Sequence, residues 1–85
     1  MPMKYKLTDD RYGDTYDNLT RDALERKLKT LFDTDEIIDT NIIDCFAVNI
    51  TAGELIDVLC VAIDTDDMPA WAKAEYLLEV SVCRR

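Results

Sequence analysis

Apolar residues recur at helical spacing in the first third of the chain. A helix is predicted over about residues 21–32, where one face carries Leu24, Leu28, Leu31 and Phe32. Thr20 comes directly before it and suits the N-cap, because its hydroxyl can accept a hydrogen bond from a backbone N–H of the first turn.

A second helix is predicted over about residues 52–63, and it is apolar on most of its sides. Thr51 and Glu54 have the spacing of a capping box at its start. Asp57 is the only polar residue between Leu55 and Ile63. A helix with so little polar surface must be surrounded by other elements, so we expect it at the centre of the fold.

A third helix is predicted to begin near Pro69, with Asp67 as its cap, because proline is well tolerated in a first helical turn. Trp71, Ala74 and Leu78 share one of its faces. Residues 78–82 then alternate between apolar and polar side chains. Continued helix is favoured there, and the alternative is a strand that pairs with residues 3–7, which also alternate.

Two segments give weaker patterns. Residues 8–18 are rich in turn formers and predict an irregular loop. Residues 34–50 contain many β-branched side chains, which favour a strand. Thr34 as a cap and the helical stripe that follows favour a helix over the same segment; the stripe comprises Ile38, Ile42, Cys45 and Phe46.

These elements predict a mainly α fold. We expect a small helical bundle of three to four helices, with an α+β fold as the alternative if an N-terminal strand pairs with a C-terminal one. A chain of 85 residues has the size of one domain, so residues 1–85 are expected to form a single compact acidic domain.

The charge is unevenly distributed. The formal net charge is −8, and no lysine or arginine occurs between Thr30 and Ala72, where ten carboxylates lie. A one-signed field of this kind favours basic partners and disfavours direct binding to nucleic acid. An acidic surface also keeps a small protein in solution without any specific partner.

Catalytic and cofactor motifs are missing from the sequence. The chain has no histidine to act as a general base, Ser81 is its only serine, and Gly13 and Gly53 are its only glycines. Residues 33–44 resemble a calcium loop in their spacing of oxygens, but Ile37 and Ile38 stand where an oxygen and a glycine are needed. We therefore expect no enzyme activity, no cofactor and no metal.

The longest apolar run covers residues 58–63 and is too short to span a bilayer, so no membrane association is expected. The first residues also lack the apolar stretch of a signal peptide. We expect a cytoplasmic protein, in a bacterium or in a phage-infected host cell.

In size, charge and lack of catalytic residues, the chain looks like the small acidic proteins that phages encode against host defences, which include DNA mimics and anti-CRISPR proteins. No particular residue carries this resemblance. It implies a non-enzymatic inhibitor that blocks a basic nucleic-acid-binding surface of a host protein complex. Carboxylates would then replace phosphates, and the predicted partner-binding residues are Asp33, Asp35, Glu36, Asp39, Asp44, Asp64, Asp66 and Asp67.

The alternative is a helical adaptor or oligomerising subunit that binds a protein through apolar and aromatic contacts. Aromatic side chains carry much of the binding energy of protein interfaces. The anchors in that case would be Tyr12, Tyr16, Trp71 and Tyr76.

Overall fold

A computed structural model of the chain describes residues 3–38 and 50–84. Within these ranges three helices accompany a three-stranded antiparallel sheet and a short two-stranded one. In chain order the elements are β1 (Tyr5–Asp9), β2 (Asp14–Leu19), α1 (Arg21–Leu31), β3 (Ile37–Ile38), β4 (Ile50–Thr51), α2 (Ala52–Thr65), α3 (Met68–Leu78) and β5 (Val80–Arg84).

The prediction of a mainly helical bundle is therefore wrong, because the fold is α+β. Three strands form a sheet of order β2-β1-β5. The predicted loop 8–18 contains β2. The helix favoured over 78–82 does not continue, because α3 ends at Leu78 and the alternative strand forms from Val80 onward as β5. Residues 37–38 pair as a strand with residues 50–51, against the helix favoured over 34–50, whose middle part, 39–49, lies outside the described residues.

The three helices agree with the sequence in place and in capping. Thr20 accepts a hydrogen bond from the Ala23 N–H, and Asp67 accepts one from the Ala70 N–H. Thr51 and Glu54 form the predicted capping box at the start of α2.

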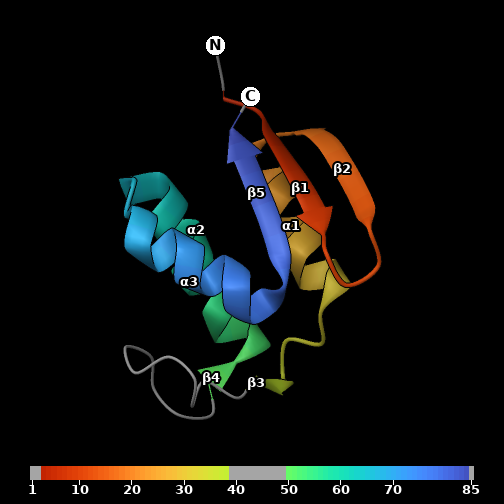
Figure 1. Cartoon of the computed structure of the whole chain (residues 1–85), viewed down its shortest axis with the longest axis vertical. Coiled ribbons are helices and arrows are strands. Elements are labelled where there is room, and N and C mark those ends of the chain that lie inside the picture. Colours follow the sequence, from red (N-terminus) through yellow and green to blue (C-terminus); the bar gives the residue numbers. More distant parts are fainter. Residues whose placement is uncertain (1–2, 39–49, 85) are drawn as a thin grey trace.

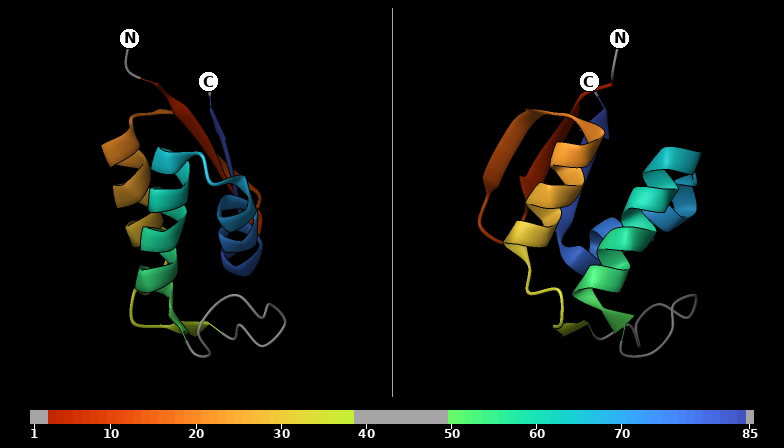
Figure 2. Two further views of the ribbon diagram at one scale, coloured as in Figure 1. Left: turned by 90° about the vertical axis from the view of Figure 1, so that its left-hand side faces the viewer. Right: turned by 180° about the vertical axis from the view of Figure 1, so that it is seen from behind.

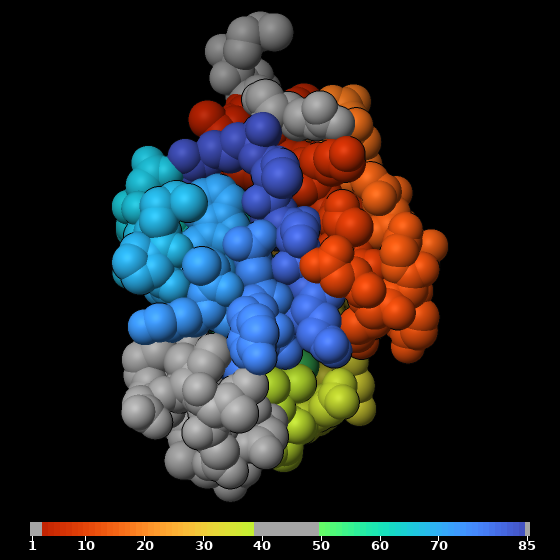
Figure 3. Space-filling model, viewed as in Figure 1, coloured from red at the N-terminus to blue at the C-terminus, as the bar shows by residue number. Residues whose placement is uncertain are grey.

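The elements form two layers. The sheet and α3 lie side by side in one layer, with α3 next to β5, and α1 and α2 cover that layer from behind (Figures 1 and 2). In the space-filling view, α3, β5 and the β1–β2 hairpin follow one another across one face (Figure 3). The edge of β5 that is not paired with β1 is thus the edge that faces α3.

A one-residue connection brings the chain from α3 into β5. Glu79 ends α3 in the left-handed region, with φ 59°, and donates its backbone N–H to the Glu75 and Tyr76 carbonyls. The strand that follows pairs antiparallel with β1, so that Leu7 lies opposite Val82. This turn places the C-terminal strand against the N-terminal one.

The core is built around α2. Its side chains Leu55, Ile56, Leu59 and Ile63 are fully or almost fully buried. They pack in one apolar cluster with α1 side chains such as Leu24, α3 side chains such as Trp71, and the inward residues of β1 and β5, among them Leu7, Val80 and Val82. The prediction that this helix forms the middle of the core is confirmed, but it is not surrounded on all sides, because Glu54, Asp57, Val61 and Asp64 stay exposed.

Among the described residues, one charged side chain is completely buried. Asp9, at the end of β1, accepts hydrogen bonds from Arg11 Nε and Nη2, each at 3.0 Å. Arg11 also donates to the Leu31 carbonyl at 3.2 Å, and its guanidinium lies 4.1 Å from the centre of the Phe32 ring. The pair therefore ties the β1–β2 turn to the C-terminal end of α1.

Replacing Leu59 by alanine should lower the free energy of unfolding by about 2–5 kcal/mol, because it removes buried methyl groups and leaves a cavity. Val61→Ala is the matched control on the same helix, since Val61 is 60% exposed and Leu59 is fully buried. Urea unfolding of both variants measures the difference. Equal losses would contradict the central position of α2.

Asp9→Asn should lower the free energy of unfolding by about 3 kcal/mol near pH 7, because it leaves the Arg11 charge without its partner. The hydrogen bonds from Arg11 hold the pKa of Asp9 below its ordinary value of 3.8. The pair therefore stabilises the fold above that value, and this contribution is lost as the pH falls through the folded-state pKa. Urea unfolding between pH 7 and pH 3 should show the variant and the wild type converging.

The exposed Asp14→Asn serves as the control for the loss of one negative charge and should change stability by less than about 0.5 kcal/mol. If it destabilised the fold as much as Asp9→Asn, the effect would be one of net charge and not of the buried pair.

Candidate functional site

A first group of the predicted partner-binding residues, with Asp33, Asp35 and Glu36, lies on the segment that leads from α1 toward α2. Its backbone is anchored to the start of α2: the Ala52 N–H donates to the Glu36 carbonyl at 2.7 Å, and the Gly53 N–H donates to the Thr34 carbonyl at 3.0 Å. A Cβ atom on Gly53 would lie 3.1 Å from both the carbonyl oxygen and the Cβ of Thr34. Glycine at this position allows the segment to approach the helix so closely.

This segment presents its carboxylates to solvent. Asp33, Asp35 and Glu36, which we call the loop cluster, are all exposed. Asp33 accepts the Asp35 N–H at 3.1 Å, but within the described ranges none of the three forms an ion pair with a lysine or arginine. Asp39 and Asp44, predicted for the same group, lie outside the described residues.

The second predicted group lies at the opposite end of α2. Asp64 is in the last turn of this helix, and Asp66 and Asp67 form the connection to α3. Since α2 has 14 residues, its length separates the two groups by about 20 Å. The structure therefore does not bring all the predicted carboxylates together.

Two members of the second group are paired within the molecule. Arg21 of α1 binds Asp64 with two hydrogen bonds, at 2.8 and 3.0 Å. Arg84 of β5 pairs with Asp66 and donates to the Ile63 carbonyl at 2.8 Å. These pairs hold α1 and β5 at the C-terminal end of α2, a role that spacing alone did not reveal.

The four predicted aromatic anchors do not form one surface patch. Trp71 is 5% exposed and belongs to the core. Tyr16 is partly buried, with the Lys27 ammonium 4.5 Å from its ring centre. Tyr12 and Tyr76 are 74% and 64% exposed, but they come from the β1–β2 turn and from α3.

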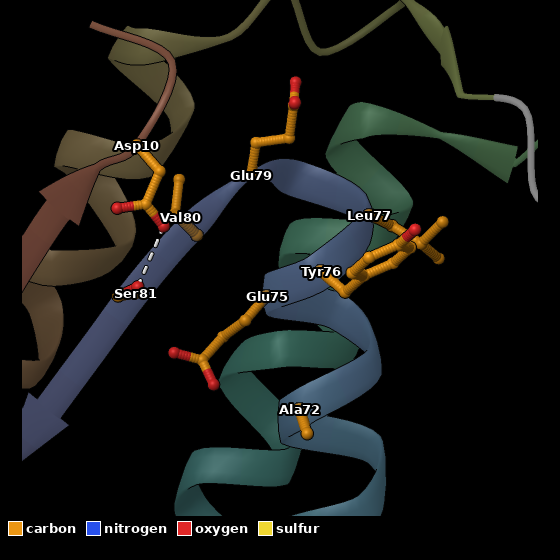
Figure 4. Close-up of a pocket in the computed structure, with 8 residues that line it drawn as sticks. All are labelled: Asp10, Ala72, Glu75, Tyr76, Leu77, Glu79, Val80 and Ser81. Atoms are coloured by element: carbon orange, nitrogen blue, oxygen red, sulfur yellow. Dashed lines mark hydrogen bonds between the residues drawn. The ribbon is translucent and has the colours of Figure 1, made fainter. Parts of the chain in front are cut away.

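Tyr76 borders a hollow of about 590 Å³ where α3 turns into β5 (Figure 4). Carboxylates of Asp10, Glu75 and Glu79 also line it. Asp10 accepts a hydrogen bond from the Ser81 hydroxyl at 2.9 Å. The Glu79 carboxylate extends away from those of Asp10 and Glu75 (Figure 4).

Glu75 has a structural role at this hollow. Its carboxylate accepts the Val82 N–H at 2.7 Å and so satisfies a donor on the free edge of β5. Burial raises the pKa of Glu75, and the hydrogen bonds from Val82 and Trp71 offset this only in part. An unpaired strand edge is open to pairing with other chains, and this contact closes part of it.

Sequence reasoning missed this hollow because it depends on β5. The alternation over 78–82 was the available signal, since a strand there places Ser81 near Asp10. The spacing of apolar residues along α3 would place Glu75 on a polar face of that helix and gives no sign of its contact with β5.

The hollow offers carboxylate acceptors and the ring of Tyr76, which suit a positively charged side chain. No metal site accompanies it among the described residues, which include no group of three or more Cys, Asp or Glu side chains that could hold a metal ion. Burial raises the pKa of the Cys60 thiol to about 11, which keeps it protonated near neutral pH.

Comparisons with protein-family models, with curated proteins and with solved structures found no match. None of the helices in the described ranges is long and apolar enough to cross a lipid bilayer.

Glu75→Gln should keep the hydrogen bond to the Val82 N–H and remove the cost of burying a charge. Because the pKa of Glu75 is raised above 4.5 in the folded state, wild-type stability should fall as the pH rises from that value through the folded-state pKa. We expect this part of the pH dependence to disappear in Glu75→Gln. Urea unfolding at several pH values from 4 to 8 measures it.

The second variant, Glu75→Ala, should lose about 1–3 kcal/mol near pH 7 because the Val82 N–H loses its partner. If both variants behaved alike, the hydrogen bond to the strand edge would have no role in stability.

Proposed function

We propose that this protein is a small non-enzymatic inhibitor that binds a basic, nucleic-acid-binding surface of a protein partner, the kind of acidic phage protein that its size and charge resemble. The observation that supports it best is the loop cluster. Asp33, Asp35 and Glu36 are exposed and lack ion-pair partners in the described part of the chain, while their backbone is fixed on the start of α2.

Fixed carboxylates are better suited to this task than mobile ones. Lysine and arginine side chains of a partner could pair with them as they pair with phosphates, and less conformational entropy is lost because the loop backbone is already ordered. Glu54 adds a fourth exposed carboxylate in the first turn of α2. The acidic field would also speed association and weaken it at high salt.

The adaptor function has less support. Of the four aromatic anchors, only Tyr12 and Tyr76 remain largely exposed, and they lie on separate elements. Such an interface would depend little on salt, which separates the two functions by experiment.

Asp35→Asn with Glu36→Gln should remove the interaction if the loop cluster binds the partner. The matched control is Asp14→Asn with Asp22→Asn, which changes the net charge equally at other exposed carboxylates. The test is a pull-down from host lysate at about 0.1 M and about 0.5 M salt, with mass spectrometry of the retained proteins.

We expect a nucleic-acid-binding protein that is retained by the wild type and the control at low salt, is lost at high salt, and is displaced by added duplex DNA. Retention of the same partner by the Asp35/Glu36 variant, or at both salt concentrations, would contradict charge mimicry by this cluster.

A further inference from the structure

The outer side of the α2–α3 pair carries a groove that the rest of the described fold leaves open. These two helices run antiparallel and adjacent, joined by residues 66–67 (Figure 2). The groove has a volume of about 340 Å³. Its apolar lining comes from both helices and comprises Val58, Val61, Ala62 and Ala70.

Val61 is the unusual residue of this groove. It is 60% exposed, although it lies between the buried Cys60 and Ala62 on the most apolar helix of the chain. A valine of this exposure gains burial only when something covers it, and each buried methylene group contributes about 0.8 kcal/mol. Small side chains at Ala62 and Ala70 leave room for an apolar side chain from outside.

The groove is bordered by negative charge. Asp57 and Asp67 line it together with Thr65. Asp67 accepts the Ala70 N–H at 3.3 Å, and neither carboxylate has an ion pair within the described ranges. Along α2 there is no basic residue, and α3 has only Lys73.

We infer that this groove binds a basic amphipathic helix of the partner protein, with an aliphatic side chain on Val61 and lysine or arginine side chains against Asp57 and Asp67. A helix laid between two others is a common packing arrangement, and apolar anchors at helical spacing would fit it. Charge disfavours the other simple occupant, because a second copy of this chain would bring its own net charge of −8 to an acidic border. The inference rests on the proposed function, since it gives the basic partner a second point of contact.

The probe is a fluorescent synthetic helix of about 15 leucine and lysine residues with its leucines on one face. A scrambled peptide of the same composition is its control, and fluorescence anisotropy at about 0.15 M salt measures the affinity for the full chain. We expect Val61→Ser to weaken binding about tenfold, because it removes apolar contact without changing the charge.

Asp57→Asn should weaken binding about threefold, and the control Asp14→Asn should leave it within about twofold. The scrambled peptide should bind the wild type about tenfold more weakly than the amphipathic one.

Equal binding of the two peptides, or no effect of Val61→Ser, would overturn the inference, because the attraction would then be unspecific. A dimer of the wild type that Val61→Ser abolishes, seen by sedimentation equilibrium, would also overturn it by making a second copy the occupant. The pull-down with the Asp35/Glu36 variant tests the proposed function separately. The groove inference and the proposed function can therefore fail independently of each other.

Discussion

The burial of α2 is the constraint on which the other contacts depend. Seven of its residues are buried, and together they cover about half of the circumference of the helix. An isolated helix of this composition would expose this apolar surface to water, so the free energy of burial requires neighbours all along this side. In a chain of 85 residues these neighbours are α1, α3 and the sheet, and each must be held against the same helix.

The ion pairs of the molecule follow from this requirement. Arg21 and Arg84 bind Asp64 and Asp66 at the C-terminal end of α2, and so secure α1 and β5 to it. Arg11 is occupied by the buried Asp9. The chain uses these bases internally, and the carboxylates without an ion pair in the described ranges include those of the loop cluster and of the α2–α3 groove. The surface potential that a partner meets is therefore set by which acids the fold has left unpaired, and the total charge alone does not determine it.

Local signals predicted the helices well, because caps and helical periodicity depend on residues a few positions apart. Thr20, Thr51 and Asp67 cap the helices as their sequence context indicates. The sheet was harder to predict, since β5 forms only because it can pair with β1, more than 70 positions away in the chain. Strand β2 has little apolar alternation and contains Asn18 in the left-handed region, so its sequence resembles a loop. The prediction of the partner-binding residues had the same limit. The sequence identified the carboxylates, but only the fold shows which of them pair with arginines.

The exposed side of α2 joins the two surfaces that we assign to the partner. Glu54, Asp57 and Val61 follow one another at intervals of three and four residues, so they form one stripe on the helix, which ends at the Asp64–Arg21 ion pair. This stripe leads from the loop cluster at one end to the groove near the other. A partner that covers it must carry bases along an elongated surface and an apolar side chain among them. Double-stranded nucleic acid offers phosphates but no apolar side chain of this kind. On our proposal, charge would attract a nucleic-acid-binding surface, and contact with Val61 would distinguish one basic protein from another.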